Sequence, residues 1–224
     1  MLWGDGKSKP QTIAVVGLGR FGGSVADALT RLGHEVLGID EDGAVVAGWR
    51  DRLAHAVEAD GTDDAVLRDL GVDRMPHAVV GIGNDMEASI LAASALVEIG
   101  VPDVWGKALG PRHGRLLTRI GVNHVVYPET AMGERVAYQV AERVLDYIDF
   151  NDGFGVAKVS APASLIGRAL GDTMMGAEFG VTVVGLKRGA APFVAATPET
   201  RVEAGDLLIV AADTQAIQRF ARAG

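Results

Sequence analysis

The sequence predicts an α/β protein with a Rossmann-like, doubly wound parallel sheet, a crossover helix and a second, smaller α+β domain. From Thr12 to about Tyr127, short β-rich runs alternate with amphipathic segments, as in a parallel sheet covered by helices. A G-x-G-x-x-G motif follows the first run directly and leads into a helical pattern. A long helical pattern follows the alternation and is broken at residues 151–153, after which the sequence changes in character. This break places a domain boundary near residue 150.

The elements of the first domain follow from the same alternation. Strands are expected over residues 12–17, 35–39, 55–59, 77–82, 103–107 and 124–127. Helices are expected between them, over residues 21–32, 43–50, 63–70, 85–99 and 111–120. Several of these helices end at a glycine, which suits a left-handed C-cap that leads into the next strand: Gly33, Gly71, Gly100 and Gly121.

A long helix is expected to leave the sheet after Glu129. Apolar residues recur at helical spacing from Met132 to Ile148, and an exposed apolar face there would indicate dimerisation or partner docking. The tail is then expected to form strands over 154–160, 181–187, 192–195 and 206–211 and helices over 164–171 and 213–221. The predicted divisions are a flexible segment 1–11, a nucleotide-binding domain 12–129, a crossover and dimerisation helix 130–150 and a small α+β domain 151–224.

Composition narrows the class of protein. The chain has 224 residues, 48% of them hydrophobic, but its apolar runs are too short to cross a bilayer. The start of the chain lacks the apolar stretch of a secretion signal, so we expect a cytoplasmic protein. The absence of cysteine excludes disulfides, thiol catalysis and thiolate zinc sites. A net charge of −8 without a long basic run argues against nucleic acid as a partner.

The glycine motif predicts a phosphate site. Gly17 allows a tight turn, Gly19 lets the backbone approach a phosphate, and Gly22 lets the helix pack closely on the strand. The helix that starts near Phe21, itself a candidate binding residue, directs its free N–H groups and positive dipole end at the anion. The alternative is that the glycines serve only the packing of strand and helix.

A carboxylate at the end of the second strand strengthens the nucleotide prediction. Asp40, with Glu41 beside it, stands at the spacing expected for an acid that accepts hydrogen bonds from both ribose hydroxyls. The same carboxylate would repel a 2′-phosphate. The pattern therefore favours an unphosphorylated adenosine ribose over NADP.

The other candidate binding residues lie where the remaining strands end. They are Asp60, Gly61 and Thr62 after the third strand, Gly81, Ile82, Gly83, Asn84 and Asp85 after the fourth, Lys107 after the fifth and Glu129 after the sixth. Arg20 in the glycine loop suggests more phosphate charge than a plain pyrophosphate carries, and Lys107 is either a second cation for it or a surface lysine. The negative charge of Glu129 would repel an anion bound beside it unless a cation compensates that charge. Glu129 therefore either bridges through a metal ion or a group of a neighbouring subunit, or is a helix N-terminal acid favoured by the macrodipole.

The histidines do not suit catalysis. A dehydrogenase needs a proton donor or acceptor near its substrate, usually histidine. Four of the five histidines, His34, His55, His77 and His124, stand just before a strand, on the side opposite the ligand crevice. His113 is expected to be structural or solvent-facing. We therefore expect no enzyme, with an NAD-dependent oxidoreductase as the alternative of another class.

Several motifs together resemble the RCK (KTN) family, the cytosolic regulatory subunits of the Ktr and Trk potassium uptake systems. The similarity extends from Thr12 to Phe220 and rests on residues 17–23, 33–40, 59–62 and 127–133 together with Lys107. It implies dimers that assemble into an octameric ring beneath a separate integral membrane potassium channel subunit of the KtrB or TrkH type. The ring would gate that channel in response to ATP or ADP, at the inner face of the membrane.

The resemblance also assigns ligands. Arg20 and Glu129 would lie at the dimer interface near the terminal phosphates, with Na⁺, Mg²⁺ or Ca²⁺ beside the glutamate. Some relatives bind NAD(H), and Asp40 cannot distinguish it from ATP. Some relatives bind cyclic di-AMP in the C-terminal lobe, whose corresponding parts here are residues 165–171 and 181–184. A free-standing nucleotide or cyclic dinucleotide sensor without a channel is the remaining alternative.

Overall fold

The computed structural model describes residues 9–141, 144–150, 153–173 and 175–223, which form two compact units. The first unit ends at Glu129 and the second begins at Thr130. Most of the expected N-terminal segment, residues 1–8, lies outside the described residues. None of the helices in the described ranges combines the length and apolar composition that crossing a bilayer requires.

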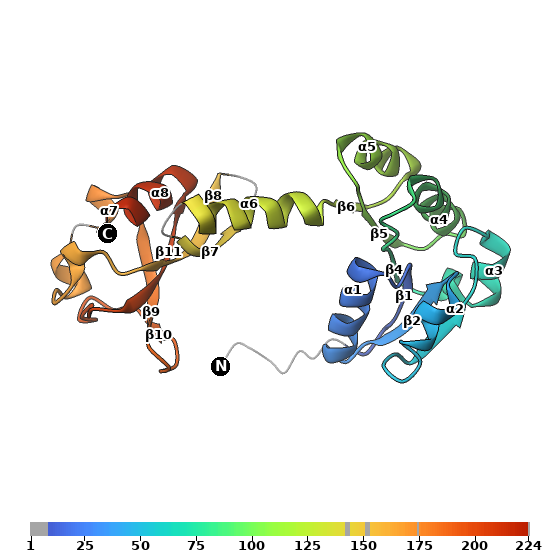
Figure 1. The fold of residues 1–224 in the computed structure, drawn as a ribbon, viewed down its shortest axis with the longest axis horizontal. Helices are drawn as coiled ribbons and strands as arrows, with labels where there is room; N and C mark the ends of the chain where they lie inside the picture. The colour runs from blue at the N-terminus through green and yellow to red at the C-terminus, as the bar shows by residue number, and fades with distance from the viewer. Residues whose placement is uncertain (1–8, 142–143, 151–152, 174, 224) are drawn as a thin grey trace. The chain divides into compact units, whose positions relative to one another are not determined.

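The first unit is built on a six-stranded, all-parallel sheet (Figure 1). The strand order is β3-β2-β1-β4-β5-β6, so the chain winds outward from β1, returns beside it as β4 and winds outward in the other direction. The strands are β1 (Thr12–Val16), β2 (Glu35–Asp40), β3 (His55–Glu58), β4 (His77–Val80), β5 (Asp103–Lys107) and β6 (His124–Val126). The reversal between β1 and β4 is the point where folds of this type bind ligands, at the carboxyl ends of the strands.

The two winding directions place helices on opposite faces of the sheet. Val15 of β1 belongs to a core cluster with Ala26 of α1. Its neighbours Ala14 and Val16 belong to a second cluster, to which α3, α4 and α5 contribute, because successive side chains of a strand point to opposite faces. The helices are α1 (Arg20–Arg31), α2 (Gly43–Ala47), α3 (Asp64–Asp69), α4 (Met86–Glu98) and α5 (Pro111–Ile120), with a 3₁₀ turn at Val72–Arg74. All the expected strands and helices of this unit are present, with ends shifted by a few residues.

The second unit contains an antiparallel five-stranded sheet of order β10-β9-β11-β8-β7. Its strands are β7 (Val144–Asp149), β8 (Phe154–Ser160), β9 (Thr182–Arg188), β10 (Val194–Ala195) and β11 (Asp206–Asp213). The helices are α6 (Pro128–Ala141), which starts in the first unit, α7 (Met175–Glu178) and α8 (Thr214–Arg222), with 3₁₀ turns at Ala163–Leu165 and Leu170–Asp172. The fully buried Ile217 and Phe220 of α8 share the core of this unit with Leu208 and Val210 of β11.

The crossover helix was predicted to be longer than it is, because the prediction included a segment that forms a strand. The helix predicted to reach Asp149 ends at Ala141, and Val144–Asp149 is instead the edge strand β7. Residues 142–143 of the predicted helix lie outside the described residues. Pairing with β8, interrupted by a bulge between Val144 and Asp146, buries Val144 and Tyr147 on one side. Three-residue spacing of apolar side chains therefore fits a bulged strand as well as a helix, and tertiary pairing decides between them.

The helix predicted over 164–171 is also wrong. Two 3₁₀ turns stand there, and Ile166 between them is extended. Gly167 follows with a φ of +83°, a left-handed conformation that interrupts any helix. The short α7 had no counterpart in the prediction, because four residues carry too little periodicity to be recognised.

Candidate functional site

A cleft of about 320 Å³ lies at the carboxyl ends of β1, β2, β3 and β4. Most of the predicted binding residues line it: Gly17, Gly19, Asp40, Glu41, Asp60, Gly61, Thr62, Gly81, Ile82, Gly83 and Asn84. The strand-end rule works here because parallel strands bring all their carboxyl ends to one edge of the sheet. Its volume lies at the lower end of the range for small-molecule sites.

The N-terminus of α1 at this cleft has free backbone donors. Its N-cap is Gly19, which offers no side-chain hydrogen bond, and its first turn contains no acidic residue. A Cβ placed on Gly19 would meet nothing within 4 Å, so open space lies before this turn. By contrast, α2, α3 and α4 are each capped by an aspartate side chain. Helix N–H groups without a cap and the helix dipole form an anion site.

Close backbone packing explains two other glycines of the loop. Gly17 has a φ of +86°, and a Cβ there would lie 2.9 Å from Cγ1 of Ile82. A Cβ on Gly22 would collide with the carbonyl oxygen of Gly17. Gly22 does not line the cleft; it allows α1 to approach the turn that does. The predicted steric roles of these glycines agree with this packing.

The Asp40 carboxylate forms hydrogen bonds with two loops of the cleft. Its Oδ2 accepts a hydrogen bond from the Leu18 N–H at 2.6 Å, and its Oδ1 accepts one from the Asp42 N–H at 3.0 Å. Each carboxylate oxygen keeps a further lone pair, so the same group can also accept hydroxyl donors of a ligand. Glu41, beside it, is exposed and also lines the cleft.

The Asp60–Thr62 loop is shaped by its own hydrogen bonds. Oδ1 of Asp60 accepts from the hydroxyl and from the N–H of Thr62, at 2.6 and 2.8 Å, and these two bonds lower the pKa of the Asp60 carboxyl. Gly61 in this loop is fixed by close packing. A Cβ there would collide with Val16, so this glycine lets the loop pack against β1.

Four predicted residues form a second group outside the cleft lining: Arg20, Phe21, Lys107 and Glu129. The Lys107 side chain is only 9% exposed, and its Nζ lies 2.6 Å from Oε1 of Glu129, which is 68% exposed. The same ammonium lies 5.7 Å from the centre of the Phe21 ring. The Lys107 hydrogen bond is the main cause that lowers the pKa of the Glu129 carboxyl, and the charge of Arg20 adds to it.

Glu129 is thus neutralised by a lysine within its own chain. Among the described residues, no group of three or more histidine, aspartate or glutamate side chains could hold a metal ion. Glu129 lies in the first turn of α6, where the macrodipole also favours it. Within one chain, Glu129 is therefore held by the Lys107 ammonium and by the helix dipole.

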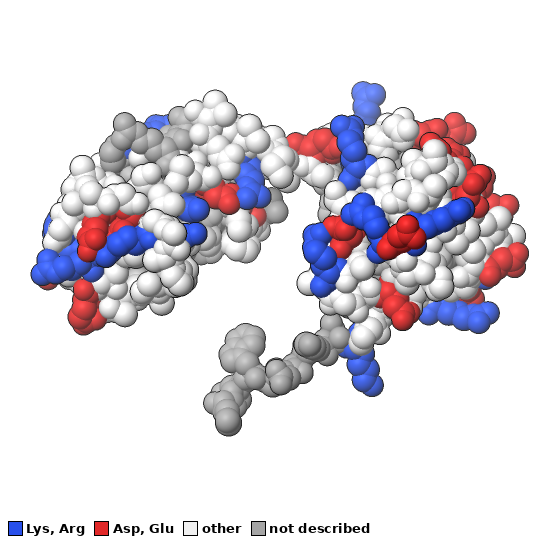
Figure 2. All heavy atoms as spheres, turned by 60° about the horizontal axis from the view of Figure 1, so that its bottom comes forward, with Lys and Arg blue, Asp and Glu red and all other residues white. Residues whose placement is uncertain are grey.

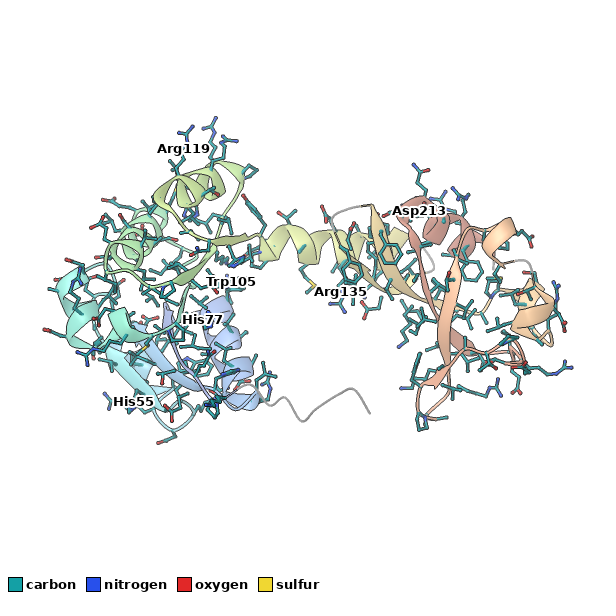
Figure 3. All side chains as sticks on the ribbon, turned by 180° about the vertical axis from the view of Figure 1, so that it is seen from behind. His55, His77, Trp105, Arg119, Arg135 and Asp213 are labelled. Carbon is teal, nitrogen blue, oxygen red and sulfur yellow. The ribbon has the colours of Figure 1, made fainter. Side chains whose placement is uncertain are left out.

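The histidines lie away from the cleft. His55, His77 and His124 begin strands, and the labelled His55, His77 and Trp105 follow one another along the sheet in Figure 3. His113 is 1% exposed, its Nδ1 accepts a hydrogen bond from the Leu109 N–H, and burial lowers the pKa of its imidazole. His113 is therefore buried and not solvent-facing.

The prediction missed one polar residue of the cleft lining, Asp42. Asp42 and the expected Asp85 line the cleft and also cap α2 and α4 through their carboxylates. The signal that could have identified Asp42 is an aspartate directly before an expected helix start. On the face drawn in Figure 2, acidic and basic side chains of the described residues are interspersed on the first unit.

Known proteins share both units of this chain. The TrkA-N domain matches residues 13–128 and the TrkA-C domain matches residues 156–223. The Ktr system potassium uptake protein C of Bacillus subtilis (strain 168) is 37% identical over 208 residues, 92% of this chain and 94% of that protein. The Ktr system potassium uptake protein A of the same strain is 33% identical over 220 residues, 98% and 99% of the two chains.

Solved structures agree in fold. The RCK domain of GsuK superposes with a TM-score of 0.67 at 17% identity and covers 98% of this chain, which spans about half (49%) of that one. The GsuK channel bound to NAD has a TM-score of 0.66 at 17% identity and covers 99% of this chain and 40% of its own. The domain matches and the Ktr relatives together show that this chain belongs to the RCK (KTN) family and is a KtrA-like regulatory protein, not an enzyme.

Proposed function

We propose that this chain is the nucleotide-binding regulatory subunit of a potassium uptake system. It would control K⁺ flux through a separate integral membrane channel subunit by an ATP- or ADP-dependent change of conformation. The observation that carries this proposal is the cleft in which the uncapped α1 N-terminus at Gly19 and the Asp40 carboxylate line the same space. The first suits phosphates and the second suits a ribose.

ATP and ADP are the ligands we favour, with NAD(H) as the alternative. All of them carry an adenosine ribose for Asp40 and phosphates for the glycine loop. Arg20, Lys107 and Glu129 support the triphosphate, because a cluster with two cations beside the loop suits additional phosphate charge. The GsuK channel, which shares the fold, has been solved bound to NAD.

The exposed face of α6 supports assembly into dimers. Met132, Val136 and Val140 are 54%, 45% and 82% exposed, and apolar residues at this spacing form one helix face. We propose that two copies pair through this face and that dimers assemble into an octameric ring. A Na⁺, Mg²⁺ or Ca²⁺ ion would then bind between Glu129, the terminal phosphate and the partner copy.

The second unit would sense a further ligand, cyclic di-AMP. The region proposed for it, residues 165–171 and 181–184, places the exposed apolar side chains of Ile166 and Val184 at the surface.

The chain would act in the cytoplasm and reach the inner face of the membrane through its channel partner. Control requires that ATP and ADP differ by about 1–3 kcal/mol in their preference for two ring shapes.

A thermal-shift series tests this function. The full-length protein is heated with ATP, ADP, NAD, NADH or cyclic di-AMP, each with and without Mg²⁺ or Ca²⁺. A ligand that binds only the folded state raises the melting temperature by mass action. A larger rise for ATP and ADP than for NAD(H) supports the proposal, whereas a rise for NAD(H) alone supports an NAD(H)-binding regulator. No shift with any of them would contradict nucleotide binding.

Assembly and partnership need two further measurements. Light scattering after size-exclusion chromatography should give the mass of eight chains, and a stable monomer would contradict ring gating. Co-purification with a membrane channel separates the proposed subunit from a free-standing sensor.

A further inference from the structure

Lys107 is a nearly buried cation at the end of β5. Its side chain is 9% exposed, and Glu129 is its ion-pair partner at 2.6 Å. A buried ammonium requires an anionic partner, because the loss of hydration is otherwise uncompensated. Glu129 is 68% exposed and also feels the charge of Arg20, so it can lose Lys107 and remain solvated. Lys107 therefore requires an anionic partner, whereas Glu129 does not require Lys107.

The Lys107 ammonium lies directly behind the wall of the cleft. Gly83 lines the cleft, and a Cβ on Gly83 would lie 2.7 Å from Nζ of Lys107. Any side chain at position 83 would thus occupy the space beside the ammonium. Because the lysine stem has four flexible carbons, rotation about its bonds can move the ammonium past Gly83 toward the cleft that Gly83 lines.

Glu129 connects this pair to the helix that crosses the unit boundary. It is the second residue of α6 (Pro128–Ala141), and the second unit begins at Thr130. The Lys107–Glu129 pair consequently joins the end of a sheet strand to the first turn of α6. Loss of the pair would remove this restraint on the helix start.

We propose that Lys107 exchanges its anionic partner, leaving Glu129 for a phosphate group in the cleft, and that this exchange transmits nucleotide binding to the start of α6. The inference rests on the proposed function, since it needs a nucleotide phosphate at the α1 N-terminus. A polyphosphate carries more charge than one carboxylate, and charge-assisted hydrogen bonds to it are strong. Lys107 is then the residue that positions α6 according to what the cleft holds.

The exchange makes opposite predictions for its two members. In buffer that contains EDTA, Glu129→Gln removes the competing anion and should tighten ATP binding about threefold to tenfold. Lys107→Met removes the shared cation and should weaken it about tenfold. In the double variant, Glu129→Gln should no longer tighten binding, because no lysine remains to be released. Lys107→Arg keeps the charge and should bind ATP within a few-fold of the wild-type protein.

Isothermal titration of ATP and ADP into these variants and a matched control measures the effect. Asp146→Asn breaks the Arg135–Asp146 pair, an ion pair of the second unit with contacts of 2.6 and 2.8 Å, and should leave ATP affinity unchanged. Hydrogen–deuterium exchange adds a second readout. ATP should speed exchange of the first-turn amides of α6 in the wild-type protein, and these amides should already exchange fast in Lys107→Met.

Each outcome decides the question. If the wild-type protein binds no nucleotide, the proposed function and the exchange both fail. If it binds ATP but Glu129→Gln weakens or does not change affinity, the exchange alone is wrong. Glu129→Gln changes an exposed side chain to one of the same shape whose amide oxygen still accepts a hydrogen bond from Lys107, so it gives an answer even if Lys107→Met does not fold.

Discussion

The two ends of the parallel sheet treat polar groups in opposite ways. At the carboxyl end, α1 starts without a cap at Gly19, and the Asp40 carboxylate keeps free acceptor positions next to open space. At the amino end, Oδ2 of Asp103 in β5 accepts hydrogen bonds from His77 at 2.9 Å and Trp105 at 3.0 Å, and its Oδ1 lies 3.0 Å from Nε2 of His124. Trp105 also stacks on His124, with ring centres 4.0 Å apart.

The difference shows how one sheet separates stability from binding. At the amino end, the polar groups around Asp103 are paired with one another, and these contacts join β4, β5 and β6. The carboxyl end leaves donors and acceptors available, which costs stability but prepares a ligand site. Substitutions at the two ends should therefore change different observables, and the predictions that follow are ordered from the largest expected effect to the smallest.

Gly22→Val should cause the largest loss, because it places a side chain where the Gly17 carbonyl lies. We expect a decrease in the free energy of unfolding of about 3 kcal/mol or more, with loss of nucleotide binding. Urea denaturation followed by circular dichroism measures it. Gly19→Ala is the matched control, since open space before Gly19 should preserve stability. Equal destabilisation by both variants would show that the loop is not packed as described.

Asp40→Asn should weaken the binding of every adenine nucleotide by about tenfold to a hundredfold. The substitution removes a charged hydrogen-bond acceptor, worth about 1.5–3 kcal/mol, from the cleft. Titration calorimetry with ATP, ADP and NADH measures the affinities. Asp27→Asn is a suitable control: Asp27 pairs with Arg31 and Arg52 outside the cleft. Unchanged affinities for Asp40→Asn would separate this residue from the ribose.

Arg20→Ala should reduce the preference for ATP over ADP by about fivefold to tenfold, because Arg20 lies in the phosphate loop and its charge reaches Glu129. The ratio of the two dissociation constants is the measurement. Arg31→Ala at the other end of α1 provides the comparison. An unchanged ratio would assign the terminal phosphate to other residues.

Asp103→Asn tests the amino end and should lower the free energy of unfolding by about 1 kcal/mol at pH 7 without changing nucleotide affinity. Burial raises the pKa of the Asp103 carboxyl, but hydrogen bonds from Trp105 and His77 and the charges of His124 and His77 outweigh it, so the pKa lies below the ordinary 3.8. A lowered pKa contributes stability that is present above the unfolded value and is lost as the pH falls through the folded value.

The pH dependence of that variant provides the check. The stability difference between wild type and Asp103→Asn should persist at pH 5 to 7 and shrink below about pH 4 as Asp103 becomes protonated. Denaturation curves at several pH values measure it. A difference that grows on acidification, or a loss of ATP affinity at pH 7, would contradict the separation of the two ends.

Sequence reasoning was most accurate where local pattern and tertiary environment agree. The strands of the first unit are bounded by polar or glycine residues and their cores are continuous apolar runs, so alternation alone located them. In the second unit, the same reasoning mistook the bulged strand β7 for part of a helix and the turns around Gly167 for another helix. Edge strands and short turns depend on partners that are distant in the sequence, and periodicity does not report them.

The candidate site shows the same division. The amino-acid sequence by itself determined the glycine loop, Asp40 and the polar strand ends, because parallel winding brings every carboxyl end to one edge. Only the tertiary structure decided that Gly61 packs on Val16, that Lys107 is buried against Glu129 and that Asp103 binds two histidines and a tryptophan. The physical reason is range: backbone geometry and helix capping act over a few residues, whereas ion pairs and close packing depend on which distant side chains meet.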